Sequence, residues 1–376
     1  MKKLLLTVAF LTAFPISTFA QSSVTLFGIV DAGITYTNNS AGKSLVQAQS
    51  GIAQANRWGL RVIEDIGGGT KVIATLENGF NGFTGKLGQG GLEFGRQSFV
   101  GVTNPTWGTL TLGRQYDPVV DMVQTTTFNG HAGPFFAHPS DIDNTDNAFR
   151  VNNAVKYVTP TWNGLTAEGM YAFGGLAGNF RGNSTIAAAL SYVNGPLYLA
   201  AGYFYALNPA QQFPDGNFQP NGTPGVSNGE GTFGYVGNPR NMQTISAGGT
   251  YTLGALQLAL NYSTVRFDNA DGIVGNTVSF DSYEAWALYY ITPLASVGGG
   301  YTFTEGKVDF NDARPKYNQF NLFIDYALSK RTDVYLMGVY QKASGGANAD
   351  IYQGIVGQQS STTGQVVARI GMRHKF

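Results

Sequence analysis

The sequence predicts an all-β protein, a transmembrane barrel of sixteen antiparallel strands with a long loop folded into its lumen. Three observations predict this fold. The last residues of the chain alternate between apolar and basic side chains and end on Phe376. Long and short turn-rich segments alternate strictly along the chain. The composition combines 51 Gly, 20 Tyr and 25 Phe with no Cys, which is typical of short strands joined by turns.

The N-terminus has the pattern of a secretory signal. Two lysines precede an apolar run over 4–14, and Pro15 and small residues then lead to Ala20. This order of charged, apolar and small residues is typical of cleaved signals. The apolar run is also shorter than the ~20 residues that a membrane-spanning helix needs. We therefore predict a signal peptide over 1–20 and a barrel over 21–376.

Overall composition limits the class of protein. The chain carries 23 basic and 23 acidic residues, a balance that does not suggest a nucleic-acid partner. Its mean hydropathy of −0.08 is too polar for a bundle of membrane helices, whereas the strands of a water-filled barrel are only half apolar. A soluble secreted β-protein also fits these values and would extract without detergent. Without cysteine there are no disulfides, so closure of the sheet has to supply the stability.

Turn-forming residues divide the chain into strands of similar length. The long connections lie at about 38–55, 81–92, 118–149, 175–184, 207–240, 268–279, 305–316 and 342–362. The short turns lie at 64–69, 104–108, 161–164, 194–195, 253–254, 292–293 and 329–331. Eight long and seven short connections predict sixteen strands. Short turns on the periplasmic side and long loops outside are typical of outer-membrane barrels.

Several segments alternate with period two, as expected when one face meets lipid and the other meets water. In 319–328, Phe320 and Leu322 fall on one face and Gln319 on the other. Arg114 is an exception, because it falls on the apolar parity of its segment. Either a bulge turns this side chain inward or another subunit covers that face.

Basic residues on the inward parity are candidates for the lining of a pore. Arg57 and Arg61 alternate with apolar residues, and a charge facing lipid costs ~2–4 kcal/mol near the middle of the bilayer. Both arginines are therefore expected inside, and the same reasoning applies to Arg150 and Lys156. Arg96 is a further candidate, although its neighbours define its parity less clearly.

The connection 118–149 is the second longest and carries four acids. Asp117 precedes it, and Asp121 is the first acid within it. A loop of this length that entered a wide barrel would narrow it. Its acids would then face a wall of arginines across the constriction, and charged walls are how pores select ions. The alternative is an ordinary solvated external loop.

Six motifs occur together along the mature chain. They are NRWGLR (56–61), EDIGGG (64–69), FGRQSFVG (94–101), LGRQY (112–116), NAVKY (153–157) and RHKF (373–376). With them the whole mature chain resembles the general porins of beta-proteobacteria. The resemblance implies a homotrimeric outer-membrane barrel in contact with lipid. It also implies passive, mildly anion-selective diffusion of ions and small hydrophilic solutes.

The resemblance further implies roles for individual residues. The arginines that favour anions at the eyelet would be Arg57, Arg96 and Arg150, with Arg61 and Lys156 added by the parity argument. The terminal Phe376 would be the residue that the outer-membrane assembly machinery reads. The sequence predicts no cofactor and no metal site.

Two alternative functions make other demands on the sequence. An enzyme would need a nucleophile and a base, and the only histidines are His131, His138 and His374. His131 and His138 lie in the 118–149 loop, where we expect them to be solvated. Together with Asp141 they form at most a weak metal-binding pattern, so we predict no catalysis. A substrate-specific channel is the remaining alternative, and a conductance that saturates with one solute would identify it.

Overall fold

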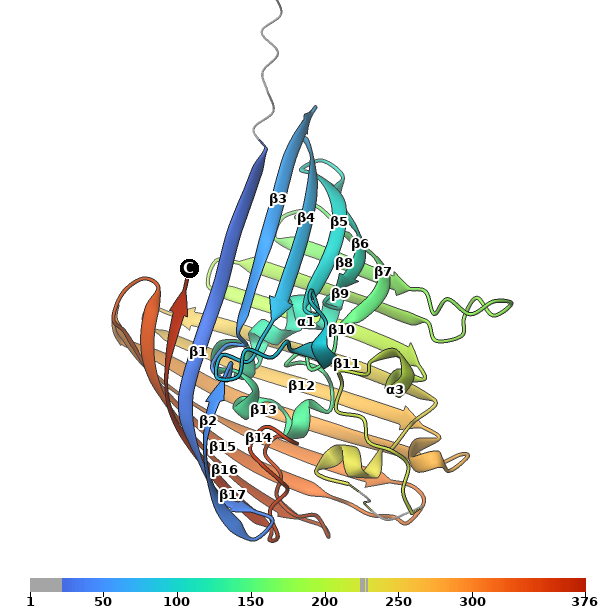
Figure 1. Cartoon of the computed structure of the whole chain (residues 1–376), viewed down its shortest axis with the longest axis vertical. Helices are drawn as coiled ribbons and strands as arrows, with labels where there is room; N and C mark the ends of the chain where they lie inside the picture. Colours follow the sequence, from blue (N-terminus) through green and yellow to red (C-terminus); the bar gives the residue numbers. More distant parts are fainter. Residues whose placement is uncertain (1–21, 224–226, 228) are drawn as a thin grey trace, which may run out of the picture.

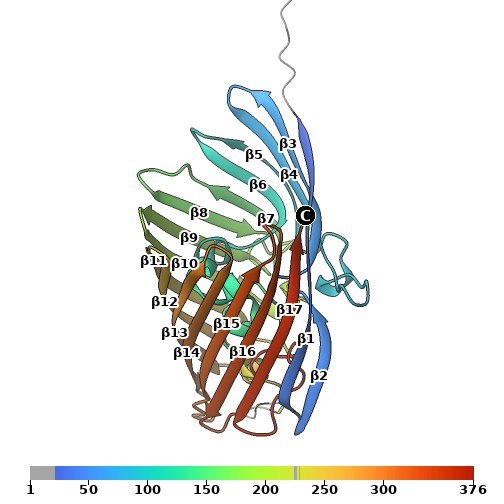
Figure 2. The ribbon, with the colours of Figure 1, turned by 90° about the vertical axis from the view of Figure 1, so that its left-hand side faces the viewer.

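The computed structural model describes residues 22–223, 227 and 229–376, and the predicted signal peptide lies outside this range. The described residues form one antiparallel sheet of seventeen strand segments, closed into the barrel of Figures 1 and 2. The strands are β1 Ser23–Ser40, β2 Lys43–Ser50, β3 Arg57–Gly67, β4 Thr70–Gly79, β5 Gln97–Asn104, β6 Gly108–Gln115, β7 Val151–Val158, β8 Leu165–Ala172, β9 Thr185–Asn194, β10 Leu197–Leu207, β11 Asn241–Leu253, β12 Leu256–Asp268, β13 Thr277–Thr292, β14 Ala295–Val308, β15 Lys316–Ala327, β16 Thr332–Ser344 and β17 Gly364–Lys375. The helices are α1 Pro118–Val123, α2 Asn129–Ala132 and α3 Pro209–Gln212, with 3-10 turns at Gln89–Gly91, Gln124–Thr126, Pro134–Phe136, Pro139–Asp141, Thr232–Tyr235 and Ala270–Gly272. None of the helices in the described ranges has the length and apolar character needed to cross a bilayer.

The barrel closes between the first and the last strand. β1 pairs with β17 along one edge, and on its other edge it pairs first with β3 and then with β2. β2 and β3 are therefore two halves of one barrel strand, so the predicted count of sixteen strands is confirmed. The terminal residue takes part in the closure, because Phe376 N donates to Gly28 O at 3.0 Å.

Asp31 on β1 binds the segment that connects β2 and β3. Its carboxylate accepts hydrogen bonds from the amides of Ile52 and Ala53 at 3.2 and 3.1 Å. It also accepts one from Arg369 Nη2 at 3.0 Å, and both side chains of this ion pair are fully buried. The break in the strand is thus held from inside the barrel by a buried, hydrogen-bonded ion pair.

The predicted long loop over 38–55 is wrong. β1 continues to Ser40 and β2 begins at Lys43, so most of this segment is a β-hairpin. Ala41 and Gly42 have φ values of 49° and 88°, the left-handed conformation that two-residue hairpin turns require. Asn39 Oδ1 accepts from the amide of Gly42 at 2.7 Å. The turn residues between 38 and 44 mark the tip of a hairpin rather than a long loop.

The predicted faces of the strands are confirmed where the alternation was clear. Phe320 and Leu322 are 53% and 49% exposed on the outer face of β15, whereas Gln319 is fully buried inside. Phe376, 44% exposed, faces outward as its parity predicts. The outer wall is therefore apolar, and the polar rows of the strands face the lumen.

A bulge resolves the orientation of Arg114. The register of β6 against β7 shifts between Gly113 and Gln115, and Gly113 has φ +137°. Arg114 is turned inward and donates to Asn152 Oδ1 and Asp215 Oδ2, both at 2.6 Å. Of the two explanations that the sequence allowed, the bulge is correct.

Candidate pore constriction

The loop between β6 and β7 packs against the inner face of the far wall. Trp286 Nε1 on β13 donates to Thr126 O at 2.9 Å, and Asn261 Nδ2 on β12 donates to Thr126 Oγ1 at 2.8 Å. Further along, Gln319 Nε2 on β15 donates to Phe135 O at 3.2 Å. In Figures 1 and 2, α1 accordingly lies within the ring of strands. The loop therefore runs inside the barrel rather than over its rim.

Asp117 starts the loop by capping α1. Its carboxylate accepts from the amides of Val119 and Val120 at 2.9 and 3.3 Å, and Pro118 occupies the first helical turn, as is typical of helix N-termini. Asn144 Nδ2 donates to the same carboxylate at 3.0 Å. Burial raises the pKa of Asp117 to about 6. Asp117 thus ties the beginning of the loop to its end.

Lys156 fastens the loop to the wall from which it leaves. Its ammonium pairs with Asp121 on α1, lies 3.0 Å from Glu168 Oε1 on β8 and donates to Tyr116 O at 3.1 Å. Both Lys156 and Asp121 are therefore engaged with other protein groups at the base of the loop.

His138 fastens the loop to the opposite wall, contrary to the expectation that it is solvated. The imidazole is fully buried, with Nδ1 2.6 Å from Asp143 Oδ2 and Nε2 3.5 Å from Glu284 Oε2 on β13. Ser263 on β12 also donates to Asp143. Burial opposes a charge on His138, but the Asp143 carboxylate prevails and raises its pKa to about 10. We call His138, Asp143, Ser263 and Glu284 the loop latch.

A polar cavity of about 490 Å³ lies between this loop, the segment 51–57, Arg96 and the end of β17. Its charged lining groups are Arg57, Arg96, Asp146, Arg150, Arg373 and Lys375. The lining therefore holds five cations and one carboxylate. Arg373 is also paired with Asp333, which lies outside the lining, at 3.0 Å.

Glu77 on β4 holds two of these arginines behind the cavity. Arg96 Nε lies 2.5 Å from Glu77 Oε1, and Arg57 Nη1 lies 3.4 Å from the same oxygen. Arg96 Nη2 also donates to Tyr116 Oη at 2.6 Å. The guanidinium carbons of Arg96 and Arg150 both lie 5.7 Å from the centroid of the Tyr116 ring. The Tyr116 ring thus lies within cation–π distance of both guanidinium groups.

The carboxylate of the cavity belongs to the loop. Asp146 Oδ1 accepts from Asn129 Nδ2 at 3.1 Å. Burial raises the pKa of Asp146 to about 7, although Arg150 and Arg96 act in the opposite direction. Arg150 donates to Ala148 O at 3.1 Å, and burial together with the charge of Arg96 lowers its pKa to about 10.

The structure brings together only some of the predicted pore residues. Arg57, Arg96 and Arg150 line one cavity. Arg61 lies apart, with its guanidinium carbon 4.1 Å from the centroid of the Phe27 ring. The remaining predicted residues are engaged elsewhere, namely Asp117 in a helix cap and Asp121 and Lys156 in the ion pair at the loop base.

Sequence reasoning did not assign four groups to this cavity. Arg373 and Lys375 have the inward parity, but only closure of β17 onto β1 carries them to β3. Tyr116 carried no signal beyond its place in the LGRQY motif. Asp146 was one of four loop acids, and nothing in the sequence distinguished it from the others.

Comparisons with known proteins agree with this architecture. A family model described as Gram-negative porin matches residues 7–346. An outer membrane porin protein of Bordetella pertussis is 29% identical, with 100% of both chains covered. Outer membrane porin protein 32 of Delftia acidovorans is also 29% identical with 100% of both chains covered.

Solved structures show the same barrel. The anion-selective porin from Comamonas acidovorans has a TM-score of 0.74 and 25% identity, with 95% of this chain and 100% of that one covered. The trimer form of OmpT from Vibrio cholerae has a TM-score of 0.68 at 14% identity, with 94% and 99% covered, and shares the fold. Because the family model matches most of the chain, this protein belongs to the Gram-negative porin family.

Proposed function

We propose that this outer-membrane porin is a passive, water-filled channel that admits small hydrophilic solutes and prefers anions. The observation that carries the proposal is the charge of the cavity lining, which holds Arg57, Arg96, Arg150, Arg373 and Lys375 but only one carboxylate, that of Asp146. Glu77 and Asp333 pair with three of these arginines from outside the lining and offset part of their charge. A cluster of one sign in a narrow passage concentrates ions of the opposite sign. The similar structure from Comamonas acidovorans is itself described as an anion-selective porin. Solutes move down their gradient, and no chemistry is catalysed.

The inward loop defines the narrowest part of the passage in this proposal. It is attached to both walls, by Lys156 at its base and by the loop latch at the far side. A loop fixed at both ends holds the position of Asp146 opposite the arginines. We therefore assign the filter to the gap between Asp146 on the loop and Arg57 and Arg96 on the wall.

Reversal potentials in planar bilayers test the proposal. Under a gradient of potassium chloride, the sign of the potential should report that chloride is the more permeant ion. A preference for potassium would overturn the assignment of the arginine cluster. A conductance that saturates with a single solute would instead identify a substrate-specific channel.

We also propose a homotrimer and an assembly role for Phe376. A trimer form is known for OmpT, which shares this fold. The Phe376 backbone pairs with Gly28 while its side chain remains partly exposed. A recognition factor would therefore reach the ring before the barrel closes. Deletion of Phe376 should lower the amount of protein assembled in the outer membrane without changing its synthesis.

The signal peptide over 1–20 belongs to the same proposed export route, and sequencing of the mature N-terminus tests it.

A further inference from the structure

The outer wall carries a groove where small residues interrupt the lipid-facing rows. One row across the strands reads Leu199, Gly249, Leu260, Ala285 and Tyr301, in which each residue pairs with the next. The two small members lie between much larger side chains. The result is a depression of about 810 Å³.

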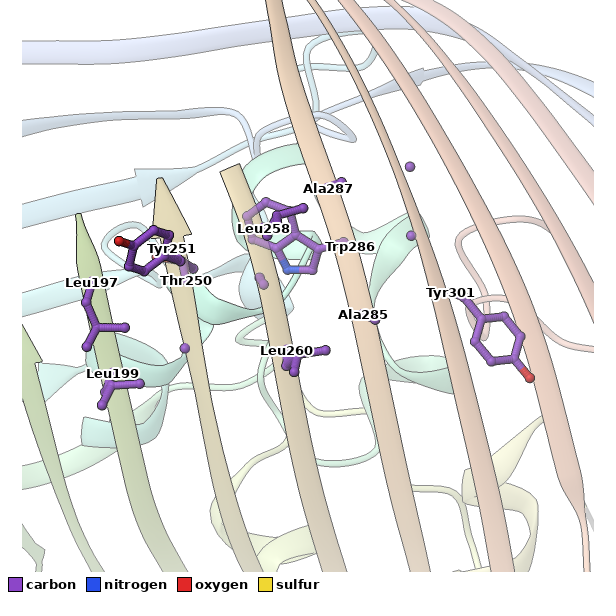
Figure 3. A pocket seen from close by; sticks show the side chains of 14 residues that line it. Leu197, Leu199, Thr250, Tyr251, Leu258, Leu260, Ala285, Trp286, Ala287 and Tyr301 are labelled. Carbon is purple, nitrogen blue, oxygen red and sulfur yellow. The ribbon is translucent and has the colours of Figure 1, made fainter. Parts of the chain in front are cut away.

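The adjacent row deepens the same depression. It pairs Leu258 with Ala287 and Ala287 with Gly299. Figure 3 shows Leu197 and Leu199 at one side of the groove, Tyr301 at the other and Leu258 and Leu260 between them. The indole of Trp286 lies behind the floor of the groove, on the lumen side, where it is buried. A neighbouring hollow of about 580 Å³ shares Gly249, Leu260 and Tyr301, so the depression extends along the wall.

One end of the groove lies near the short turns. Leu197 is the first residue of β10, Leu258 is the third of β12, and Ala287 lies five residues before the end of β13. All three positions are close to the short turns. Because short turns face the periplasm in this class of barrel, the groove opens into the periplasmic leaflet of the outer membrane.

The chemistry of the groove suits a hydrocarbon chain rather than a charged head group. The segments 194–199, 249–260 and 283–303 contain no Lys, Arg or Asp. Their single Glu, Glu284, faces the lumen and accepts from the Phe128 amide at 3.1 Å. The Tyr301 hydroxyl is already used, since it donates to Asn318 Oδ1 at 2.6 Å. Nothing on the lining would select an anionic head group.

The shape of the groove also argues against a two-fold contact with a second copy of this chain. In a two-fold contact each copy presents the same surface to the other, so two concave faces would enclose an unfilled space. An unfilled apolar space forfeits dispersion contacts. A flexible linear chain can enter the groove and restore those contacts.

We propose that this groove binds an acyl chain of a glycerophospholipid from the periplasmic leaflet. The floor formed by Gly249, Ala285, Ala287 and Gly299 admits the chain, and the flanking leucines and tyrosines hold it. The head group stays at the level of the short turns without a specific contact. The site is independent of the arginine cluster and of ion selectivity.

Native mass spectrometry of the full protein, extracted from outer membranes in a mild detergent, tests this proposal. Phospholipid should remain bound to the wild type. The double variant Ala285→Leu with Ala287→Leu fills the floor with side chains that are ordinary on a lipid-facing surface. The double variant should retain about tenfold less phospholipid than the wild type. This factor corresponds to about two methylene groups of the acyl chain that no longer contact the groove. The matched control is Ala188→Leu, an outward-facing alanine on β9 near the long-loop side, which should retain lipid like the wild type.

Several outcomes would overturn the proposal. The wild type is measured first, because absence of bound phospholipid there refutes the site without any variant. Retention of lipid A in place of phospholipid would assign the groove to the other leaflet. Equal loss in the double variant and in Ala188→Leu would mean that the lipid has no defined site. Dissociation of the oligomer by the double variant alone would identify the groove as a subunit interface.

Discussion

Arg96 Nε lies 2.5 Å from Glu77 Oε1, and both side chains are almost completely buried. The same Glu77 oxygen lies 3.4 Å from Arg57 Nη1 and accepts a hydrogen bond from Tyr116 Oη at 3.2 Å. One carboxylate therefore orients two arginines and cancels only part of their charge. The rest of the positive charge remains directed at the cavity, where it acts on permeating ions.

Neutralising one arginine of the cavity should weaken the preference for chloride. A unit charge about 5 Å from an ion in a water-like medium contributes ~0.8 kcal/mol, about fourfold for each ion and with opposite sign for chloride and potassium. Arg57→Gln or Arg150→Gln should therefore lower the chloride-to-potassium permeability ratio by up to about sixteenfold. Reversal potentials at low salt, where screening is weakest, measure this ratio. Arg61→Gln is the matched control and should change the ratio less, because Arg61 lies over Phe27 outside the cavity. Equal effects at Arg61 and Arg57 would show that the whole lumen, and not this cluster, sets the selectivity.

The preference for anions should also depend on pH through Asp146. Burial raises the pKa of Asp146 to about 7, so its carboxyl group is neutral below that pH and negative above it. The cavity gains a negative charge as pH rises through 7, and the chloride preference should therefore be greater at about pH 5.5 than at about pH 8.5. Asp146→Asn should keep the high preference across this range. A wild type whose selectivity did not change over this range would contradict the placement of Asp146 at the filter.

The barrel was predictable from the sequence because its physical signals are local. Phe320 and Leu322 face lipid, and Gln319 faces the lumen. Because one face of each strand meets lipid and the other meets water, apolar and polar residues alternate along the strand with a period of two. Turn residues likewise mark where strands end. The hairpin at Ala41 and Gly42 was missed because turn-forming residues dominate 38–44, and the alternation over 46–49 is too short to identify a strand by itself.

The cavity was only partly predictable, since it depends on contacts between distant segments. The inward parity of Arg57 and Arg150 follows from the cost of placing charge in lipid. The roles of His138 and Lys156 follow from partners on other strands, Glu284 and Glu168. No local pattern reveals which loop acid meets which wall residue, because the path of the loop through the lumen is set by packing rather than by period.

The loop latch should contribute strongly to stability. His138→Gln removes the cation between Asp143 and Glu284 and leaves two buried carboxylates, which typically costs ~3–5 kcal/mol. His131→Gln is the matched control, since His131 is in the same loop but packs on Trp286 outside the latch. Guanidinium unfolding of both variants in detergent micelles measures the difference. Similar midpoints for the two variants would mean that the latch is dispensable.

The contribution of the latch should also vary with pH in a defined direction. The folded pKa of His138, about 10, lies above its usual 6.5, so its stabilisation is complete below 6.5 and is lost as pH rises through 10. The Asp143 pKa is lowered from 3.8 to about 2 by His138 and by hydrogen bonds, against the effect of burial. Its stabilisation is therefore complete above 3.8 and is lost as pH falls through 2. The gap between wild type and His138→Gln should be widest between about pH 4 and 6.5 and should shrink toward pH 10.

Gly113 should be the least replaceable residue of the bulge that orients Arg114. A Cβ at this position would lie 2.2 Å from Ser98 O, and φ is +137°, a conformation that costs other residues about 1–3 kcal/mol before any clash is counted. Gly113→Ala should therefore lower the free energy of unfolding by more than this amount or shift the register of β6. Gly169→Ala on β8 is the matched control, because a Cβ there meets nothing within 4 Å. This variant should change the free energy of unfolding by less than about 0.5 kcal/mol.

A shifted register of β6 would return Arg114 to the lipid face and separate it from Asp215. Comparison with Arg114→Gln, which loses the ion pair but keeps the bulge, distinguishes backbone strain from the lost contact. If Gly113→Ala were as stable as Gly169→Ala, the bulge would not be the device that turns Arg114 inward.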